Sequence, residues 1–234
     1  MNTTTMPGSH DSLHALHDAS IGEAPSEMAP AMALALAGSF GSAEHWREGF
    51  AAMARALGTE AGWLLLVFVP RTGLLVNRWA TDPVHAQADG VPILAFDADD
   101  GAQVADFLAR IAWDGVYARY QDAVQAASEA LAVEAAQVDP AHSTVVDVRR
   151  RAVFEQAGTM LPGASWRDPA HVTDWAAELP AGRDVLVYCV YGHEVGRATA
   201  LKLRALGVPA RFIAGGIDGW VTAGLPVTTK EGDK

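Results

Sequence analysis

Apolar and polar residues alternate with helical spacing in the first part of the chain. Residues 26–37 are rich in Ala, Met and Leu and predict a helix that ends near Gly38. Ser42 is a suitable N-cap for a second, amphipathic helix over residues 43–57. Two helices are therefore expected at the start of the first domain.

The pattern then changes to short apolar runs. Residues 62–70 and 72–80 are two β-rich runs that a tight turn joins, and residues 91–97 form a third. Helical composition returns near residues 105–111 and continues through residues 113–137. The order predicts an α+β domain with two helices and a three-stranded antiparallel sheet.

Strands and helices alternate in the last part of the chain. The expected strands are residues 143–148, 184–190 and 210–215, with helices between and after them. Such alternation predicts an α/β domain with a parallel sheet flanked by helices. The predicted organisation is a flexible leader (1–22), the α+β domain (23–132), a linker (133–142), the α/β domain (143–228) and a tail (229–234).

The leader contains three histidines with helical spacing. His10, His14 and His17 would lie on one helical face, which makes metal binding conceivable. We predict instead a poorly ordered segment with incidental histidines, because chain termini are often disordered.

Charge is distributed unevenly along the chain. The formal net charge is −11, and residues 1–142 hold 6 Lys and Arg against 18 Asp and Glu. Like charges repel, so nucleic acid and anionic membranes are not expected partners of this part. Half of the residues are apolar, which is enough for packed cores.

The chain has one cysteine, so it forms no intramolecular disulfide. The N-terminus has no basic segment followed by an apolar one, and the apolar run from Trp63 to Pro70 is too short to span a bilayer. We therefore expect a cytoplasmic protein without membrane contact.

Cys189 closes the apolar run 184–188 and opens a turn before a helix expected near Gly196. Ligands bind at such turns in open α/β sheets. Backbone amides of the turn, with Gly192 in it, and the helix dipole would lower the pKa of the thiol and hold an anion. The alternative is an inert buried cysteine. We predict a reactive nucleophile.

Residues 143–226 resemble the rhodanese (sulfurtransferase) domains. The resemblance depends on Asp147-Val148-Arg149, Leu161-Pro162-Gly163-Ala164, the strand that ends in Cys189, the glycine-containing loop, and Gly215-Gly216-Ile217-Asp218-Gly219-Trp220. It implies that the cysteine takes a sulfane sulfur from a donor such as thiosulfate and becomes a persulfide. The sulfur then passes to a thiophilic acceptor such as cyanide or a thiol, without a metal or another cofactor.

The resemblance also assigns the site. Cys189 carries the sulfur, the loop amides hold the persulfide, and Arg197 adds positive potential. Asp147 and Arg149 support the loop from below. The predicted loop residues are Val190, Tyr191, Gly192, His193, Glu194, Val195, Gly196 and Arg197. His193 and Glu194 replace the basic residues of members with strong thiosulfate activity, so anionic donors gain less attraction.

A phosphatase of the Cys-x5-Arg type is not expected. Its arginine would bind the oxyanion with two of its guanidinium nitrogens. The position that requires this arginine is Val195, and Arg197 comes two residues later.

Residues 23–127 resemble the C-terminal α/β portion of the iron/manganese superoxide dismutases. The segments that resemble it are residues 22–50, Gly62-Trp63-Leu64, residues 92–97, and Ile111-Ala112-Trp113-Asp114 with Tyr117 and Tyr120. That family binds one metal with three histidines and an aspartate. Asp97 matches the aspartate, but Gly101 stands at a histidine position. We predict a non-catalytic module without a metal, in which Asp97 is a turn carboxylate.

These observations predict a sulfurtransferase that acts on a small sulfur donor and a thiol or cyanide acceptor. Its acidic first domain would recruit a protein partner or shape access to Cys189. The alternative is a non-enzymatic sulfur- or redox-sensing or binding protein in which Cys189 is modified as a signal. A working superoxide dismutase is a third hypothesis, which metal analysis would test.

Overall fold

The structure is a computed structural model that describes residues 9–24, 26–57, 61–98, 103–139 and 142–230, with side chains from Ser12 onward. The chain divides into two compact units. The N-terminal unit contains Met1–Val69 and Leu75–Tyr120. The C-terminal unit contains Pro70–Leu74 and Gln121–Lys234.

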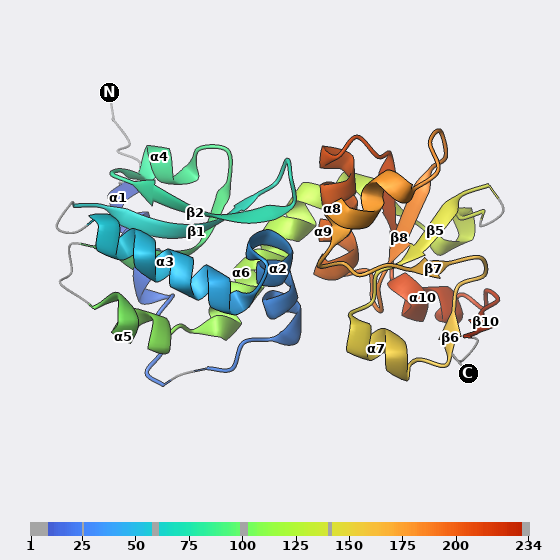
Figure 1. Ribbon diagram of the computed structural model, residues 1–234, viewed down its shortest axis with the longest axis horizontal. Coiled ribbons are helices and arrows are strands. Elements are labelled where there is room, and N and C mark those ends of the chain that lie inside the picture. The colour runs from blue at the N-terminus through green and yellow to red at the C-terminus, as the bar shows by residue number, and fades with distance from the viewer. Residues whose placement is uncertain (1–8, 25, 58–60, 99–102, 140–141, 231–234) are drawn as a thin grey trace, which may run out of the picture. The chain divides into compact units, whose positions relative to one another are not determined.

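A three-stranded antiparallel sheet forms the centre of the N-terminal unit, as predicted (Figure 1). Its strands are β1 (Trp63–Val69), β2 (Leu74–Ala80) and β3 (Val91–Asp97), in the order β2-β1-β3. The β1 side chains from Trp63 to Phe68 are all buried. Because β1 is the middle strand and is covered on both faces, it is continuously apolar rather than alternating.

The helices of the N-terminal unit include the two that the sequence predicts. The second one is confirmed as α3, and its N-cap Ser42 accepts a hydrogen bond from the amide of His45. The first begins four residues later than predicted, because Pro30 fixes its first turn, and it passes Gly38 to end before Gly41, whose φ is 87°. The helices are α2 (Pro30–Phe40), α3 (Ala43–Leu57), α4 (Pro83–Gln87), α5 (Val104–Ala109) and the first part of α6 (Trp113–Ser128), whose residues from Gln121 onward belong to the C-terminal unit.

The prediction of a flexible leader is wrong for its described part. Helix α1 spans Ser9–Asp18 and packs on β3. Leu13 and His17 are 2% and 6% exposed, so the helix contributes an apolar residue to the core beside Trp63. The side chain of His10 lies outside the described residues. Burial of Leu13 contributes to the free energy that holds this helix on the sheet.

A parallel five-stranded sheet forms the C-terminal unit, again as predicted. The strand order is β4-β9-β8-β5-β7, and every paired neighbour runs parallel. The strands are β4 (Ala132–Val133), β5 (Thr144–Asp147), β7 (Ser165–Trp166), β8 (Val185–Tyr188) and β9 (Ala210–Ile213). The helices are α7 (Arg151–Gln156), α8 (Val172–Trp175), α9 (Glu194–Ala205) and α10 (Gly216–Thr222).

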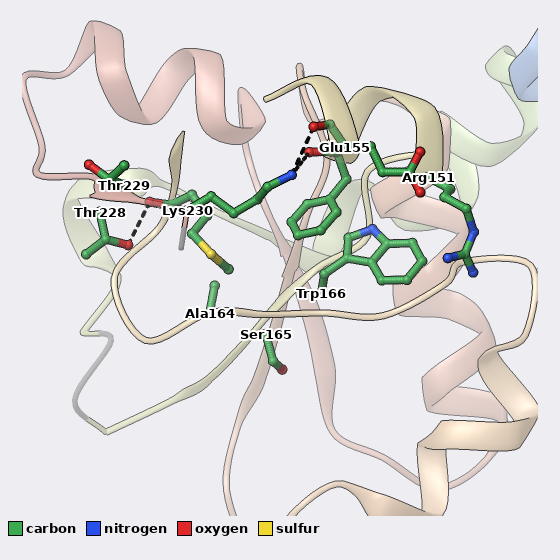
Figure 2. A pocket seen from close by; sticks show the side chains of 10 residues that line it. Arg151, Glu155, Ala164, Ser165, Trp166, Thr228, Thr229 and Lys230 are labelled. Carbon is green, nitrogen blue, oxygen red and sulfur yellow. Dashed lines mark hydrogen bonds between the residues drawn. The ribbon is translucent and has the colours of Figure 1, made fainter. Parts of the chain in front are cut away.

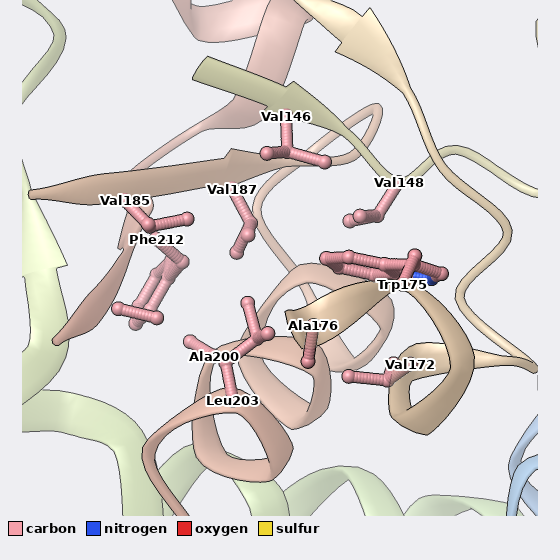
Figure 3. Close-up of a cluster of buried hydrophobic side chains, with 11 residues drawn as sticks. Val146, Val148, Val172, Trp175, Ala176, Val185, Val187, Ala200, Leu203 and Phe212 are labelled. Atoms are coloured by element: carbon pink, nitrogen blue, oxygen red, sulfur yellow. The ribbon is translucent and has the colours of Figure 1, made fainter. Parts of the chain in front are cut away.

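Successive residues of the central strands enter two different cores. Val185 and Val187 pack with α8 and α9, and Figure 3 shows this cluster with Trp175 and Phe212. Leu186 and Tyr188 point to the opposite face, where they pack with Trp220 of α10. The alternation follows from the two-residue period of a strand, and both faces are apolar because helices cover both.

Part of the predicted linker is folded. Val133 belongs to β4, which pairs with β9, and Ala135 lies in the 3-10 helix η2 (Ala135–Gln137) and is buried. The long helix predicted through residue 137 therefore ends earlier, at Ser128, and is followed by the 3-10 helix η1 (Glu129–Leu131). The other domain boundaries remain predictions.

The start of the predicted tail is also folded. Thr229 belongs to β10 (Thr228–Thr229), which pairs with β6 (Thr159–Met160) in a small antiparallel sheet. The remaining short elements include the 3-10 helix η3 (Ala176–Glu178). Among the helices of the described residues, none has the length and apolar character that crossing a bilayer requires.

Candidate active site

Cys189 lies directly after β8, at the carboxyl end of a central strand. Its side chain is 6% exposed, and residues 190–193 connect it to α9, which begins at Glu194. Three backbone amides, those of Gly192, His193 and Gly196, donate hydrogen bonds to the sulfur. The structure thus brings the predicted loop around the thiol, with the first turn of α9 on one side.

The start of α10 holds this loop in place. The amides of Ile217 and Asp218 donate 3.0 Å hydrogen bonds to the carbonyls of Cys189 and Val190. Gly216 has a φ of +59°, and a Cβ there would lie 2.4 Å from the carbonyl oxygen of Val190. A glycine is therefore required for α10 to approach the loop.

Gly192 of the loop is required for the same reason, and Gly196 leaves space beside the thiol. Gly192 has a φ of +70°, and a Cβ on it would lie 2.7 Å from the amide nitrogen of Gly215. At Gly196 a Cβ would lie 3.4 Å from the sulfur of Cys189. Larger residues at these positions would displace the loop or fill the space beside the thiol.

The pKa of the Cys189 thiol is raised, contrary to our prediction. Burial is the largest cause and opposes the thiolate. The amides of Gly196, Gly192 and His193 lower the pKa, as expected, but the nearby charge of Glu194 raises it further. The loop amides lower the pKa of the Cys189 thiol, but burial and the charge of Glu194 together raise it by more.

Glu194 is buried, with 7% of its surface exposed, although it is a carboxylate at a loop. Its Oε2 accepts a 3.2 Å hydrogen bond from Nε2 of Gln121, which lies in the part of α6 that belongs to the C-terminal unit. His193 is exposed, and its ring lies 5.7 Å from that of Tyr191, which is 56% exposed. The loop therefore presents two aromatic rings to solvent and holds its carboxylate inside.

Arg197 fixes the loop from the first turns of α9. Its Nε donates a 2.9 Å hydrogen bond to the carbonyl of Gly192, and Nη1 donates a 3.3 Å bond to Oγ of Ser128. The guanidinium carbon lies 4.4 Å from the centre of the Phe212 ring. Burial lowers the pKa of Arg197, and the charge of Cys189 acts in the opposite direction. Arg197 thus acts on the thiol at a distance and on the loop directly.

Asp147 and Arg149 form a buried network at the same end of the sheet. Nε of Arg149 lies 2.9 Å from Oδ2 of Asp147, and the hydroxyl of Tyr188 donates to the same oxygen at 2.8 Å. The Tyr188 hydroxyl oxygen in turn accepts a 3.2 Å hydrogen bond from the amide of Leu161. Burial lowers the pKa of Arg149, but the hydrogen bonds and charge of Asp147 prevail and raise it. Because Tyr188 precedes Cys189, the network holds the strand end beneath the loop.

A separate pocket of about 910 Å³ lies between α7, β7 and β10 (Figure 2). The rings of Phe154 and Trp166 stack in it, 5.2 Å apart. Both cations of the pocket have partners: Lys230 donates to the carbonyls of Phe154 and Glu155, and Arg151 pairs with Asp168. Cys189 is not among its lining residues, and we assign no chemistry to it.

Asp97, which matches the metal-binding aspartate of the dismutases, has two histidines of α1 near it. Asp97 is the last residue of β3 and is 7% exposed, so it is not a turn carboxylate as predicted. His14 Nε2 lies 3.5 Å from its Oδ2, but Nδ1 of His17 lies 3.2 Å from both the amide of Asp97 and the carbonyl of Ala95. Gly101 lies outside the described residues.

Within the described ranges, no three His, Cys, Asp or Glu side chains lie together as a metal would require. We therefore derive no step through a metal.

Two contributors to the site are absent from the sequence prediction, and a third is present there without its role. Gln121 and Ser128 lie in a helix that the prediction assigns to the first domain, and no local pattern connects them to the loop. Gly216 is part of the quoted Gly-Gly pair, so its sequence signal was present, but its role follows only from the approach of α10 to the loop.

Comparisons with known proteins give separate matches for the N-terminal and C-terminal parts of the chain. Residues 129–223 match the Rhodanese-like domain family. The N-terminal part is similar to the superoxide dismutase [Fe] of Cupriavidus metallidurans, with 39% identity over 124 residues. That match covers 48% of this chain and 62% of the relative, so the chain spans less than two thirds of it.

Solved structures with similar regions include a rhodanese-related protein from Thermoplasma volcanium, at 22% identity and a TM-score of 0.38, which covers 42% of this chain and 98% of that chain. A protein from Lactobacillus plantarum is 25% identical with a TM-score of 0.39, over 44% of this chain and 90% of its own. A thiosulfate sulfurtransferase from Pseudomonas aeruginosa is 23% identical with a TM-score of 0.38, and the match covers 43% of this chain and 19% of that chain. The C-terminal part of the chain is a rhodanese-like domain, joined to an N-terminal part similar to an iron superoxide dismutase.

Proposed function

We propose that the protein is a sulfurtransferase that carries sulfane sulfur on Cys189. In the first half-reaction the Cys189 thiolate attacks the outer sulfur of a donor R–S–SH, which gives Cys–S–SH and releases R–S⁻. In the second, an acceptor thiolate R′–S⁻ attacks that outer sulfur, which gives R′–S–SH and returns the Cys189 thiolate. No external oxidant or reductant takes part.

The observation that supports this proposal is the amide ring around the Cys189 sulfur. The amides of Gly192, His193 and Gly196 converge at the carboxyl end of a central strand, within the segment that matches the rhodanese-like family. Such a ring stabilises negative charge on a bound sulfur without a metal. A persulfide is more acidic than a thiol and extends one atom further into the loop, so the ring suits the intermediate better than the resting cysteine.

The N-terminal unit has a different role in this proposal. We propose a non-catalytic module whose acidic character recruits a protein partner or shapes access to Cys189. Its excess of Asp and Glu over Lys and Arg favours a partner with basic residues. Cytoplasmic location remains a prediction.

Intact mass spectrometry tests the proposal. The full chain is incubated with thiosulfate, 3-mercaptopyruvate or glutathione persulfide, beside the Cys189→Ser variant. The expected result is a gain of about 32 Da, one sulfur, that a reductant removes and the serine variant lacks. Transfer of that sulfur to cyanide or a thiol completes the cycle.

The absence of an adduct from every donor would contradict the sulfurtransferase. The remaining hypothesis would be a protein in which modification of Cys189 is a signal rather than a catalytic step. In that case oxidation of Cys189 should change the stability or the binding of the full chain, while no sulfur is transferred to an acceptor.

A further inference from the structure

We propose that Lys230 is a positioning residue of the candidate active site, because it holds the two segments against which the Arg149 guanidinium rests. These segments are α7 and β6, which lie outside the five-stranded sheet and contact Arg149. The effect of Lys230 on sulfur transfer rests on the proposed function, whereas its effect on the position of Arg149 does not.

Helix α7 depends on contacts with other segments. It is short and none of its residues is fully buried, so it does not hold its own position. Nζ of Lys230 donates hydrogen bonds of 2.7 and 3.1 Å to the carbonyls of Phe154 and Glu155, near the end of that helix (Figure 2). A cation is favourable at the end of a helix, towards which the carbonyls point. The ammonium group of Lys230 therefore fastens the end of α7.

The backbone of the same residue holds β6. The Lys230 amide donates a 2.9 Å hydrogen bond to the carbonyl of Gly158, and Thr229 pairs with Thr159 of β6. The Thr159 carbonyl accepts a 2.9 Å hydrogen bond from Nη2 of Arg149. Pairing of the two strands thus fixes an acceptor that Arg149 uses besides Asp147.

The Phe154 ring connects Lys230 to Arg149 a second time. Nζ of Lys230 lies 4.2 Å and the guanidinium carbon of Arg149 lies 5.6 Å from the centre of that ring. Because Lys230 bonds to the Phe154 carbonyl, it also fixes the backbone that carries the ring. Arg149 is only 4% exposed, so these protein contacts, rather than water, decide where its charge lies.

Arg149 transmits this constraint towards Cys189. Its Nε lies 2.9 Å from Oδ2 of Asp147, the oxygen that accepts the Tyr188 hydroxyl, and Tyr188 directly precedes Cys189. Lys230 lies outside the segment that matches the rhodanese-like family, which ends at residue 223. A contact beyond the matched segment therefore supports the network beneath the catalytic loop.

Hydrogen exchange measured by NMR on the full chain tests the geometry without any sulfur chemistry. The amide of Arg149 donates to Oδ1 of Asp147 at 3.0 Å, and the amide of Leu161 donates to the Tyr188 hydroxyl at 3.2 Å. Exchange of these two amides reports local opening of the buried network. The variant is Lys230→Met, which keeps an unbranched side chain and removes the donor and the charge.

In Lys230→Met the two amides should exchange roughly tenfold faster than in the wild type, because two hydrogen bonds from a charged donor are lost. Lys230→Arg should restore most of the protection, since a guanidinium also donates to carbonyls and lies over aromatic rings.

Two control variants separate this effect from a loss of charge and from a general loss of stability. Arg151→Met removes the other cation of the same pocket, which lies over Trp166 and pairs with Asp168, and it should leave both amides at the wild-type rate. Val172→Ala removes methyl groups from the buried cluster of Figure 3 and should lower the urea midpoint at least as much as Lys230→Met. Unchanged exchange in Lys230→Met, or equal acceleration in either control, would overturn the positioning role.

Sulfur loading tests the consequence for Cys189. In Lys230→Met the maximal rate constant should fall roughly threefold or more, while the half-saturating donor concentration stays within roughly twofold, because Lys230 positions the network and touches no donor. An unchanged maximal rate, or a change in the half-saturating concentration alone, would contradict the effect on sulfur transfer. If the wild type takes no sulfur from any donor, the proposed function fails, whereas the exchange rates still decide whether Lys230 positions Arg149.

Discussion

Tyr188 donates its hydroxyl hydrogen bond to the buried carboxylate of Asp147, across two neighbouring parallel strands, and accepts the amide of Leu161 at the same oxygen. Tyr188 directly precedes Cys189 in the chain. Because Tyr188 and Asp147 are fully buried, water does not replace a lost partner.

Replacing Tyr188 with phenylalanine should therefore destabilise the C-terminal unit by about 1–3 kcal/mol, because the Leu161 amide and one Asp147 oxygen lose a buried partner. Urea unfolding measures the change. Tyr191→Phe removes a hydroxyl from a 56% exposed side chain and serves as the control. Equal stabilities of the two variants would show that the buried network contributes nothing measurable.

Gly216→Ala should disturb the catalytic loop. The added Cβ would lie 2.4 Å from the Val190 carbonyl oxygen, and φ is +59°, so we expect a loss of about 1–3 kcal/mol and at least roughly tenfold slower sulfur loading. Gly219→Ala is the control: it lies in α10, its nearest contact is 3.5 Å away, and it should be neutral or stabilising. Wild-type loading by Gly216→Ala would contradict the role of α10.

Alkylation of Cys189 by iodoacetamide should remain slow at neutral pH and rise steeply in alkali. The thiolate is the reactive form, and burial raises the pKa of this thiol. The rate should still increase at a pH above about 8.5, where an ordinary cysteine is already half ionised. Mass spectrometry follows the reaction, with urea-unfolded protein as the reference. A rate that levels off at lower pH than the reference would refute the direction of the shift.

Lys202→Met should stabilise the protein at pH 7. Lys202 is 9% exposed, and burial lowers its pKa to about 8. Between that value and the unfolded pKa near 10.4 the unfolded chain binds more protons, so Lys202 makes stability increase with pH in this window. Below the window both states are protonated, and the destabilising contribution of Lys202 is constant and at its largest. The variant should gain roughly 1–3 kcal/mol at pH 7. The difference between the two proteins should shrink towards pH 10; a constant difference would exclude titration as the cause.

Leu13→Ala should destabilise the N-terminal unit by about 2–4 kcal/mol, because it leaves a cavity beside Trp63 where α1 packs. Val84→Ala, at a side chain that is 75% exposed, should change stability by less than about 0.5 kcal/mol. Thermal unfolding compares the two. If Leu13→Ala were as stable as Val84→Ala, the first helix would contribute no packing energy.

The elements that follow directly from local patterns were predictable. The apolar runs of β1 and β8 mark buried strands, and Ser42 marks the start of α3. Cys189 at the end of an apolar run already places a thiol at the carboxyl edge of a sheet. Errors occur where packing overrides the local pattern: α1 is polar on average but buries Leu13, and Val133 in the predicted linker pairs with β9.

The amino-acid sequence by itself determined the order of strands and helices, the single thiol and its place after a strand, because periodicity and turn residues act over a few neighbours. Only the tertiary structure decided how reactive that thiol is and which residues surround it. Its raised pKa depends on burial, and the contact of Gln121 with Glu194 joins residues 73 positions apart. Burial and electrostatic fields depend on every group that packs around a site, wherever it stands in the chain.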